Sequence, residues 1–232
     1  MLLPDAHIHL EALGLQQVRP ALCVTCTPSE FDRAAKHYST VALGLHPWII
    51  TKENAKELLE DFVERLPKTR LIGEVGLDFY KRYVQFDCIQ SYIFTSICKA
   101  LVQGDYVLSI HARGAATAVL DTLEDTALAK NCTCILHGFN GSSPELTRAL
   151  DLGCLFSLGP RQLATRRGRE YARQLPAERI LLETDADGSR PFTLEDWERE
   201  LDGALATLEE IRSVSMRGRV EENWARVFGK SR

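Results

Sequence analysis

The sequence has no long apolar run, no glycine-rich dinucleotide loop and no excess of positive charge. Its hydrophobic stretches fall well short of the roughly 20 residues that a membrane-spanning helix needs. Leu2-Leu3 is followed at once by Pro4 and Asp5, which is unlike a signal peptide. The net charge of −4 offers no general attraction to nucleic acid, so a polyanion would have to be held by local arginines or metal ions. We expect a soluble, cytoplasmic protein with no membrane association.

Cysteine is present, but not in the pattern of a disulfide framework. Seven is an odd number, and the close pairs Cys23/Cys26 and Cys132/Cys134 have no second pair at zinc-ribbon spacing. Both pairs lie in apolar runs of β type. We therefore expect reduced, buried structural thiols, which suit a cytoplasmic protein.

Short apolar runs alternate with segments of helical period throughout the chain. They predict eight strands, near residues 2–9, 20–26, 40–45, 70–75, 106–111, 133–137, 154–158 and 179–184. Alternating strands and helices favour right-handed parallel crossovers, and 232 residues without a linker or repeat suit one domain. We predict a single α/β domain, residues 1–232, folded as a (β/α)₈ barrel of TIM type. An open doubly wound sheet is the alternative.

Helical periods are clearest in four of the intervening segments. We expect a helix capped by Ser29 and running to about Tyr38, with others at about 52–66, 85–102 and 193–211. A short terminal helix is expected through Asn223 and Phe228.

Side chains able to bind metals stand where the predicted strands end. They are His7 and His9 on the first strand and, on later ones, His46, Glu74, His111, His137 and Asp185. Barrel enzymes carry their chemistry at the C-terminal ends of the strands, so all seven are expected at one mouth. His37 lies in a charged helical segment and is expected to be exposed.

Glu74 is the centre of this pattern. It ends an apolar run between Gly73 and Gly76, where other groups can approach the backbone and where a carboxylate needs a cation or a hydrogen-bonded partner. Residues spaced by two share one face of a strand, so Asp5, His7 and His9 should point the same way, and the two histidines can bind one metal ion.

A second pair of nitrogen donors comes from His111 and His137, and Glu74 between the two pairs is placed to bridge two ions. Such a bridged pair produces an attacking hydroxide and stabilises both oxygens of a hydrolysed ester. Asp185 can ligate the first ion and act as general base, although it could also simply cap the strand end. Glu183 is the weaker candidate for a ligand.

Six ordered motifs resemble those of the TatD family of metal-dependent deoxyribonucleases: His7-x-His9, Gly44-x-His46-Pro47, Gly73-Glu74-x-Gly76-x-Asp78, His111-x-Arg113, His137-x-Phe139-x-Gly141 and Glu183-Thr184-Asp185. Asn223 to Phe228 also resembles the family's ending. The resemblance implies an amidohydrolase-like barrel with two divalent ions, Mg, Mn or Zn. It implies His7, His9, Glu74 and Asp185 around one ion, Glu74, His111 and His137 around the other, and His46 and Arg113 beside the substrate.

Two segments depart from the family pattern. The family usually has Cys and Ser within the motif that begins at His137, and Ser-Pro after Asp185, whereas this chain has Gly138, Asn140 and Ala186-Asp187. These changes spare the ligands and put the substrate preference in doubt. Residues 157–169 and the compact length resemble the TatD-type nuclease of the Qat anti-phage system.

Arginines supply the candidate phosphate contacts. Arg113 should project beside His111 and bind phosphate through its guanidinium fork, or else pair with Asp78. Arg161, with Arg166 and three further arginines, follows the seventh strand, and these two are expected to hold the phosphates that flank the scissile bond. A solvated helix face is the alternative for the arginines, and a strand cap is the alternative for His46.

These observations favour a cytoplasmic, monomeric deoxyribonuclease that acts as an exonuclease on single-stranded or frayed DNA ends. The resemblance adds a role in anti-phage defence, with protein partners from a defence operon. Two alternatives stay open. One is a metal-dependent amidase or deacylase, because the same barrel also hydrolyses carbonyl compounds. The other is a non-catalytic subunit of a defence complex, against which the complete ligand set argues.

Overall fold

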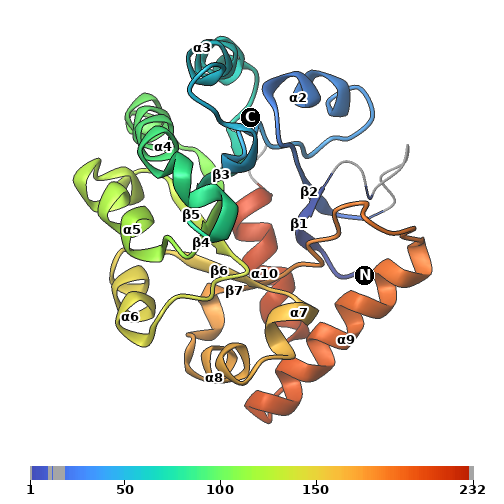
Figure 1. Ribbon diagram of the computed structural model, residues 1–232. Coiled ribbons are helices and arrows are strands. Elements are labelled where there is room, and N and C mark those ends of the chain that lie inside the picture. Colours follow the sequence, from blue (N-terminus) through green and yellow to red (C-terminus); the bar gives the residue numbers. More distant parts are fainter. Residues whose placement is uncertain (1, 10–11, 13–18, 230–232) are drawn as a thin grey trace.

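The computed structural model describes residues 2–9, 12 and 19–229, and in these residues seven parallel strands form two sheets. β1 pairs with β2, and the larger sheet has the order β3-β4-β5-β6-β7. Figure 1 shows the strands at the centre with helices around them. The strands are β1 (Asp5–His9), β2 (Ala21–Val24), β3 (Leu71–Asp78), β4 (Val107–Arg113), β5 (Thr133–His137), β6 (Leu155–Leu158) and β7 (Ile180–Leu182).

Backbone hydrogen bonds join the two sheets into a ring. On one side, the N–H of Asp185 donates to His7 O at 3.0 Å and that of His9 donates to Ala186 O at 2.9 Å, linking the end of β7 to β1. On the other side, the predicted strand at 40–45 lies between β2 and β3. The ring of eight β segments confirms the prediction of a (β/α)₈ barrel.

The segment at 40–45 differs from prediction, because it makes only two isolated bridges, Cys23 to Val41 and Leu43 to Ile72. The backbone of Thr25 interrupts the ladder: it exchanges hydrogen bonds with Gly73 O and with the N–H of Glu74, at 3.1 and 3.0 Å. The carbonyl of Thr25 comes so close to Gly44 that a Cβ there would lie 1.6 Å from it. The segment at 40–45 cannot form a regular ladder with β3 where the backbone of Thr25 lies between them.

The described helices are α2 (Pro28–Ala34), α3 (Ala55–Arg65), α4 (Asp87–Leu101), α5 (Ala116–Asp125), α6 (Ser143–Asp151), α7 (Pro160–Leu163), α8 (Arg166–Gln174), α9 (Leu194–Arg212) and α10 (Arg217–Phe228). Short 3₁₀ turns lie at Pro47–Ile49, Leu66–Lys68, Lys81–Phe86, Leu128–Lys130 and Ala177–Arg179. The helices expected at 52–66, 85–102, 193–211 and the C-terminus are confirmed with slightly different ends. None of the described helices is long and apolar enough to cross a membrane.

The predicted cap of the first of these helices was wrong. Thr27, not Ser29, is the N-cap of α2: its hydroxyl accepts from the N–H of Glu30 at 3.2 Å, and the Glu30 carboxylate accepts from the N–H of Thr27. This capping box, with Pro28 at the first helical position, fixes the start two residues earlier. The helix ends at Ala34, before Tyr38.

Alternation along the strands gives the barrel two apolar layers. Outward residues such as Leu108 and Phe156 join the large core beneath the helices. Inward residues near the start of the strands form a second cluster that α10 closes, and Figure 1 shows this helix behind the strands. The second cluster contains Ala6, Val107, Ile135, Leu155, Leu181 and Val227, with Trp224 and Phe228 against it. The opposite end of the barrel is left for polar groups.

Candidate metal centre

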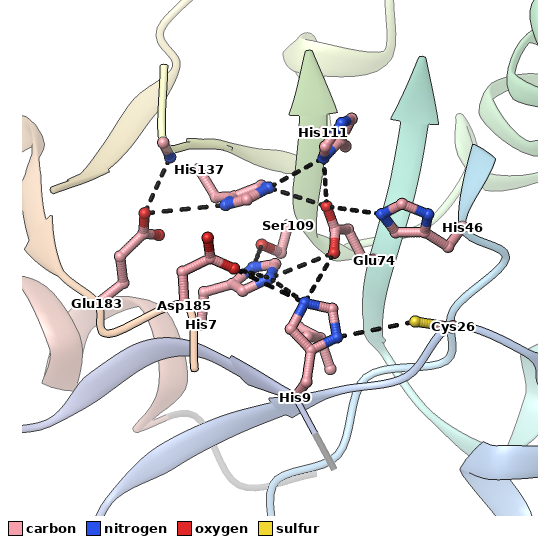
Figure 2. Close-up of polar contacts among 12 residues, drawn as sticks. His7, His9, Cys26, His46, Glu74, Ser109, His111, His137, Glu183 and Asp185 are labelled. Atoms are coloured by element: carbon pink, nitrogen blue, oxygen red, sulfur yellow. Dashed lines mark hydrogen bonds and ion pairs between the residues drawn. The ribbon is translucent and has the colours of Figure 1, made fainter. Parts of the chain in front are cut away.

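One buried carboxylate gathers five imidazoles at the C-terminal ends of the strands. Glu74 is 1% exposed, and a ring nitrogen of each histidine lies within 3.3 Å of one of its oxygens. Figure 2 shows the five rings around it: His7, His9, His46, His111 and His137. The convergence predicted for these strand ends is therefore present in the structure.

Close backbone packing places Glu74 there. At Gly76, φ is +138°, and a Cβ would lie 2.1 Å from the carbonyl oxygen of His111. At Gly73, an added Cβ would lie 3.0 Å from the Cβ atom of Ser109. The two glycines therefore let β3 and β4 approach closely enough for His111 to reach Glu74, as expected from the sequence.

One side of Glu74 faces the first strand. The Oε2 atom lies 3.3 Å from Nε2 of His7 and 3.3 Å from Nε2 of His9. Asp185 completes this side, because its Oδ1 lies 3.9 and 3.7 Å from the same two nitrogens. Two nitrogens and two carboxylate oxygens thus surround one point.

The other side of Glu74 faces the fourth and fifth strands. Its Oε1 atom lies 2.6 Å from Nδ1 of His111, 2.8 Å from Nε2 of His137 and 3.2 Å from Nε2 of His46. The two oxygens of the Glu74 carboxylate therefore contact different histidines.

Partners outside the centre assign the ring protons. His111 Nε2 lies 3.1 Å from Asp78 Oδ2, and a carboxylate there holds the proton on that nitrogen. Its Nδ1 lies 2.6 Å from Glu74 Oε1, and a cation that displaces the proton between these two atoms would meet a lone pair there. In three other histidines, Nδ1 faces away from Glu74. Nδ1 of His7 lies 2.7 Å from the Ser109 hydroxyl, Nδ1 of His9 lies 3.7 Å from the Cys26 sulfur, and Nδ1 of His137 lies 3.8 Å from a Glu183 oxygen.

His46 has the opposite arrangement. Its Nδ1 accepts a hydrogen bond from the backbone N–H of Trp48 at 3.1 Å, so the proton of the neutral ring is on Nε2. That nitrogen faces Glu74 Oε1 at 3.2 Å. His46 therefore presents a hydrogen-bond donor to the centre, whereas a metal ligand needs a lone pair.

Electrostatics keep Glu74 ionised. Burial by itself would raise its pKa, but the surrounding imidazoles, first His46 and His137, hold the pKa well below its usual range. Burial lowers the pKa of His7 well below its ordinary value and also lowers that of His46. Burial opposes the charged forms of His9, His111 and His137 as well, but Cys26 and Glu74 beside His9, and Glu74 beside the other two, raise the pKa of these three rings. A divalent cation at Glu74 would therefore displace protons from them when it binds.

The centre also contains two buried atoms that lack a hydrogen-bond partner among the described residues: Nδ1 of His137, on the far side of its ring from Glu74, and Oε2 of Glu74. Such an atom is costly to bury unless a cation meets it. Three sets of nitrogen and oxygen donors lie within 4.8 Å of one another: His7, His9 and Asp185; His7, His137 and Glu183; His46, Glu74 and His111. The residues fit divalent metal ions, with imidazole suiting zinc or manganese and carboxylates suiting magnesium or manganese.

Asp185 is the most accessible acid of the centre, with 29% of its side chain exposed. Its φ of +53° is left-handed, a conformation that Asp tolerates, and turns the chain after β7 toward the mouth. Burial and the nearby carboxylates Glu183 and Glu74 raise the pKa of Asp185 to about 6, although His137 opposes the shift. Arg161 Nη1 lies 3.4 Å from its Oδ2.

Glu183 is buried beside the centre. Its oxygens accept hydrogen bonds from the hydroxyl of Ser157 and, at 3.0 Å, from the N–H of Gly138. It also lies 3.8 Å from His137 Nδ1, on the ring's far side from Glu74. Its contacts therefore orient His137 and the loop at Gly138.

The centre opens into a cavity of about 680 Å³. Arg113 and Arg161 both line it, but Arg113 lies 4.5 Å over the ring of Tyr80 rather than pairing with Asp78. Among the arginines of α8, Arg167 lines the cavity, and the exposed Arg166 lies outside the lining.

Asp5 differs from prediction, because it does not join His7 and His9. The register of β1 is irregular between Asp5 and Ile8, and the Asp5 carboxylate accepts from the Thr184 hydroxyl at 2.7 Å and from Trp197 Nε1 at 2.8 Å. It ties β1 to the chain that carries Asp185. Simple alternation along the strand cannot reveal such an irregularity.

The seven cysteines are free, and Cys23, Cys132 and Cys134 are buried as predicted. Cys26 is half-buried and lines the cavity with its thiol at His9, so its expected purely structural role was too narrow. Sequence reasoning also missed the contacts of Ser109 and Trp48. The sequence around these two residues does not predict the contacts, because their partners are distant in sequence and come close only in the folded protein.

Comparisons with known proteins place these features in context. The family model described as "TatD related DNase" matches residues 5–229. The Escherichia coli protein named "Uncharacterized metal-dependent hydrolase YjjV" is 32% identical over 208 residues, which are 78% of this chain and 78% of that protein. The Pantoea ananatis protein named "3'-5' ssDNA/RNA exonuclease TatD" is 31% identical over 66% of this chain and 60% of its own length.

Two solved structures share the fold. The crystal structure of the Escherichia coli TatD homologue YjjV has a TM-score of 0.78 at 23% identity and covers 99% of this chain and 98% of its own. That of an uncharacterized amidohydrolase from Saccharomyces cerevisiae has a TM-score of 0.73 at 16% identity, covering 98% and 100%. At these identities the likeness concerns the fold alone, and it agrees with the barrel described above.

Proposed function

The chain belongs to the TatD-related DNase family and is a hydrolase, and on that premise we propose that it hydrolyses the phosphodiester bonds of single-stranded DNA with two divalent metal ions. The observation that carries this proposal is the division of donors around Glu74. Oε2 meets His7, His9 and Asp185, and Oε1 meets His111 and His137. Glu74 would bridge two ions, one on each side.

When bound, the ions would lower the pKa of an attacking water and stabilise the charge that develops on the phosphate oxygens. Asp185 is placed to take the proton of that water. With 29% of its side chain exposed at the cavity, its carboxylate can reach a water there and accept a proton.

His46 has a separate role in this proposal. Its Nε2–H points to the same side as His111 and His137. A hydrogen-bond donor there would stabilise a phosphate oxygen as negative charge builds up on it. His46 would thus contact substrate rather than metal.

Arginines at the cavity support an anionic substrate. Arg113 and Arg161 both line the cavity, Arg113 two residues after His111 and Arg161 with its guanidinium 3.4 Å from Asp185. Both are candidates for phosphate contacts, Arg113 at the scissile group and Arg161 at a flanking one. Arg166 stays a candidate only for a more distant phosphate, because it lies outside the cavity lining.

The test is hydrolysis of end-labelled single-stranded DNA, duplex DNA and RNA by chelated protein to which Mg²⁺, Mn²⁺ or Zn²⁺ is returned. We expect mononucleotide products from single-stranded DNA with at least one of these ions and none with chelator. No cleavage of any strand, together with cleavage of an amide or acyl ester, would replace the nuclease by a deacylase.

Further features are part of the same proposal. We propose that residues 1–232 form one domain that acts as a monomer in the cytoplasm, where free cysteines are stable. A role in anti-phage defence, with partners encoded in a defence operon, stays a prediction from the resemblance to the Qat nuclease.

A further inference from the structure

Large aromatic side chains form a wall at the edge of the cavity: Trp48 lines the cavity, Tyr83 stacks on Trp48, and Tyr80 lies against the lining residue Arg113. Trp48 is 46% exposed and Tyr80 is 42% exposed. The rings of Trp48 and Tyr83 are stacked, with centroids 5.2 Å apart and an angle of 6° between their planes. Exposed aromatic groups that gather beside a polar site indicate a binding surface.

This wall is held in a fixed orientation. The indole Nε1 of Trp48 donates to Asp78 Oδ2 at 2.6 Å, and the same carboxylate oxygen contacts His111 Nε2 at 3.1 Å. The guanidinium of Arg113 lies 4.5 Å over the ring of Tyr80. The flat groups are therefore positioned before any ligand binds, and no ordering cost is added on binding.

The wall adjoins the proposed phosphate site. The centroid of the Trp48 ring lies 4.8 Å from that of His46 and 6.0 Å from that of His111. Figure 2 shows His46 on the opposite side of Glu74 from Glu183. In a nucleotide the base is joined to its phosphate through one sugar, so a phosphate at the centre would bring its own base to this wall.

We propose that Trp48 and Tyr83, flanked by Tyr80 and Arg113, form a stacking site for a nucleobase of the strand that is cleaved. The proposal rests on the proposed nuclease function and specifies how the substrate is held. Stacking on aromatic faces tolerates any base, since every base has a π face. A base paired in a duplex cannot reach the wall, so the site selects single-stranded or frayed ends.

Different groups at the cavity would then bind different parts of the DNA strand. Arg161 and Arg167 also line the cavity: Arg161 lies beside Asp185, and Arg167 donates to Asn140 O at 2.8 Å. Cationic groups suit the sugar-phosphate chain, and aromatic groups suit the bases. An apolar protein segment would find no counterpart for these arginines, which is why a nucleic acid strand is the better occupant.

The test compares deoxyadenosine 5′-monophosphate with 2-deoxyribose 5-phosphate on the metal-loaded protein, because the two ligands differ only by the base. We expect the nucleotide to bind about tenfold more tightly, which is within the range of base stacking. It should also quench tryptophan fluorescence, and Trp48 would be the reporter, since Trp197 is 2% exposed and Trp224 packs against Phe228.

Matched variants locate the effect. Tyr83→Leu should reduce the tenfold preference to about twofold or less, and Tyr83→Phe should restore it because the ring is kept. Tyr92→Leu is the control: Tyr92 is 60% exposed on α4, and it is not among the rings that contact Trp48, so the preference should not change.

Equal affinities in the unmodified protein, or a preference that survives Tyr83→Leu, would overturn the stacking site. A separate outcome tests the function beneath it. Preference for the nucleotide without any DNA cleavage would keep the stacking site and refute the nuclease, whereas cleavage without preference would do the reverse.

Discussion

The two ends of the barrel are built from the same strands and differ in nearly every chemical respect. At the start of β5 and β6, Ile135 and Leu155 point into an apolar cluster closed by α10. Two residues further along each strand, His137 and Ser157 belong to the metal centre or to its support. The change from apolar to polar side chains takes two residues along each strand.

This contrast separates stability from chemistry. The apolar end removes hydrocarbon from water and requires no particular charge, so it can stabilise the barrel without constraining the mouth. The mouth gathers histidines and carboxylates that oppose burial, and it depends on the remainder of the barrel for its geometry. Substitutions at the two ends should therefore affect different measurements.

The largest effect is expected at the mouth from Glu74→Gln. The side-chain volume is kept and the charge shared by both sides of the centre is lost, so hydrolysis should fall by at least about 10³-fold while the protein stays folded. Activity, metal content and the circular dichroism spectrum check this. Glu170→Gln, at an exposed glutamate, is the matched control. Turnover close to that of the unmodified protein, with metal content unchanged, would contradict the bridging role.

Leu155→Ala should have the opposite profile at the apolar end. The cavity left in the closed cluster should lower the free energy of unfolding by about 2–5 kcal/mol, with little change in activity per folded molecule. Urea unfolding and initial rates measure the two quantities. Leu194→Ala, at a leucine that is 53% exposed, should change stability by less than about 0.5 kcal/mol. Equal losses from both leucines would mean that α10 does not close a tightly packed end.

A third substitution sharpens the division within the mouth. Because His46 presents a donor, His46→Ala should lower turnover by about 10²-fold, the cost of losing one stabilising donor, and leave the metal content unchanged. His111→Ala should release metal, since its Nδ1 would present a lone pair to a cation beside Glu74. Metal analysis after gel filtration separates the two, and loss of metal from His46→Ala would make His46 a ligand.

Much of this arrangement could be predicted from the sequence because strand ends in a parallel barrel converge. The positions of His7, Glu74 and His137 follow from counting strands, and the glycines near Glu74 predict close packing of the backbone there. The order of the apolar runs along the sequence was sufficient to predict the (β/α)₈ barrel. The ladder at 40–45 and the start of α2 were misjudged, through local contacts of Thr25 and Thr27, and α2 also ends earlier than predicted.

What could not be predicted are contacts between distant segments that follow no period. Asp78 was part of a motif, but the fold alone shows that it joins Trp48 to His111. The irregular register of β1 turned Asp5 away from its expected neighbours. The exposure of Arg161 and its contact with Asp185 likewise depend on how the loops after β6 and β7 meet.

Asp78→Asn should give the smallest of these effects, and it tests whether the support of the centre matters as well as its ligands. The carboxylate receives the N–H of His111 at 3.1 Å, that of Trp48 at 2.6 Å and the backbone N–H of Tyr80 at 2.8 Å. An amide has one acceptor oxygen, so its NH₂ group would face a donor and the His111 proton would no longer be fixed on Nε2. Metal affinity or activity should fall by about 10–100-fold, as for other groups that orient a metal-binding histidine. His37→Ala, at the exposed histidine of the turn after α2, should be silent in the same titration. If Asp78→Asn were equally silent, the proton on His111 would have to be fixed by Glu74 alone, and the assignment of Nδ1 as the metal-facing lone pair would fail.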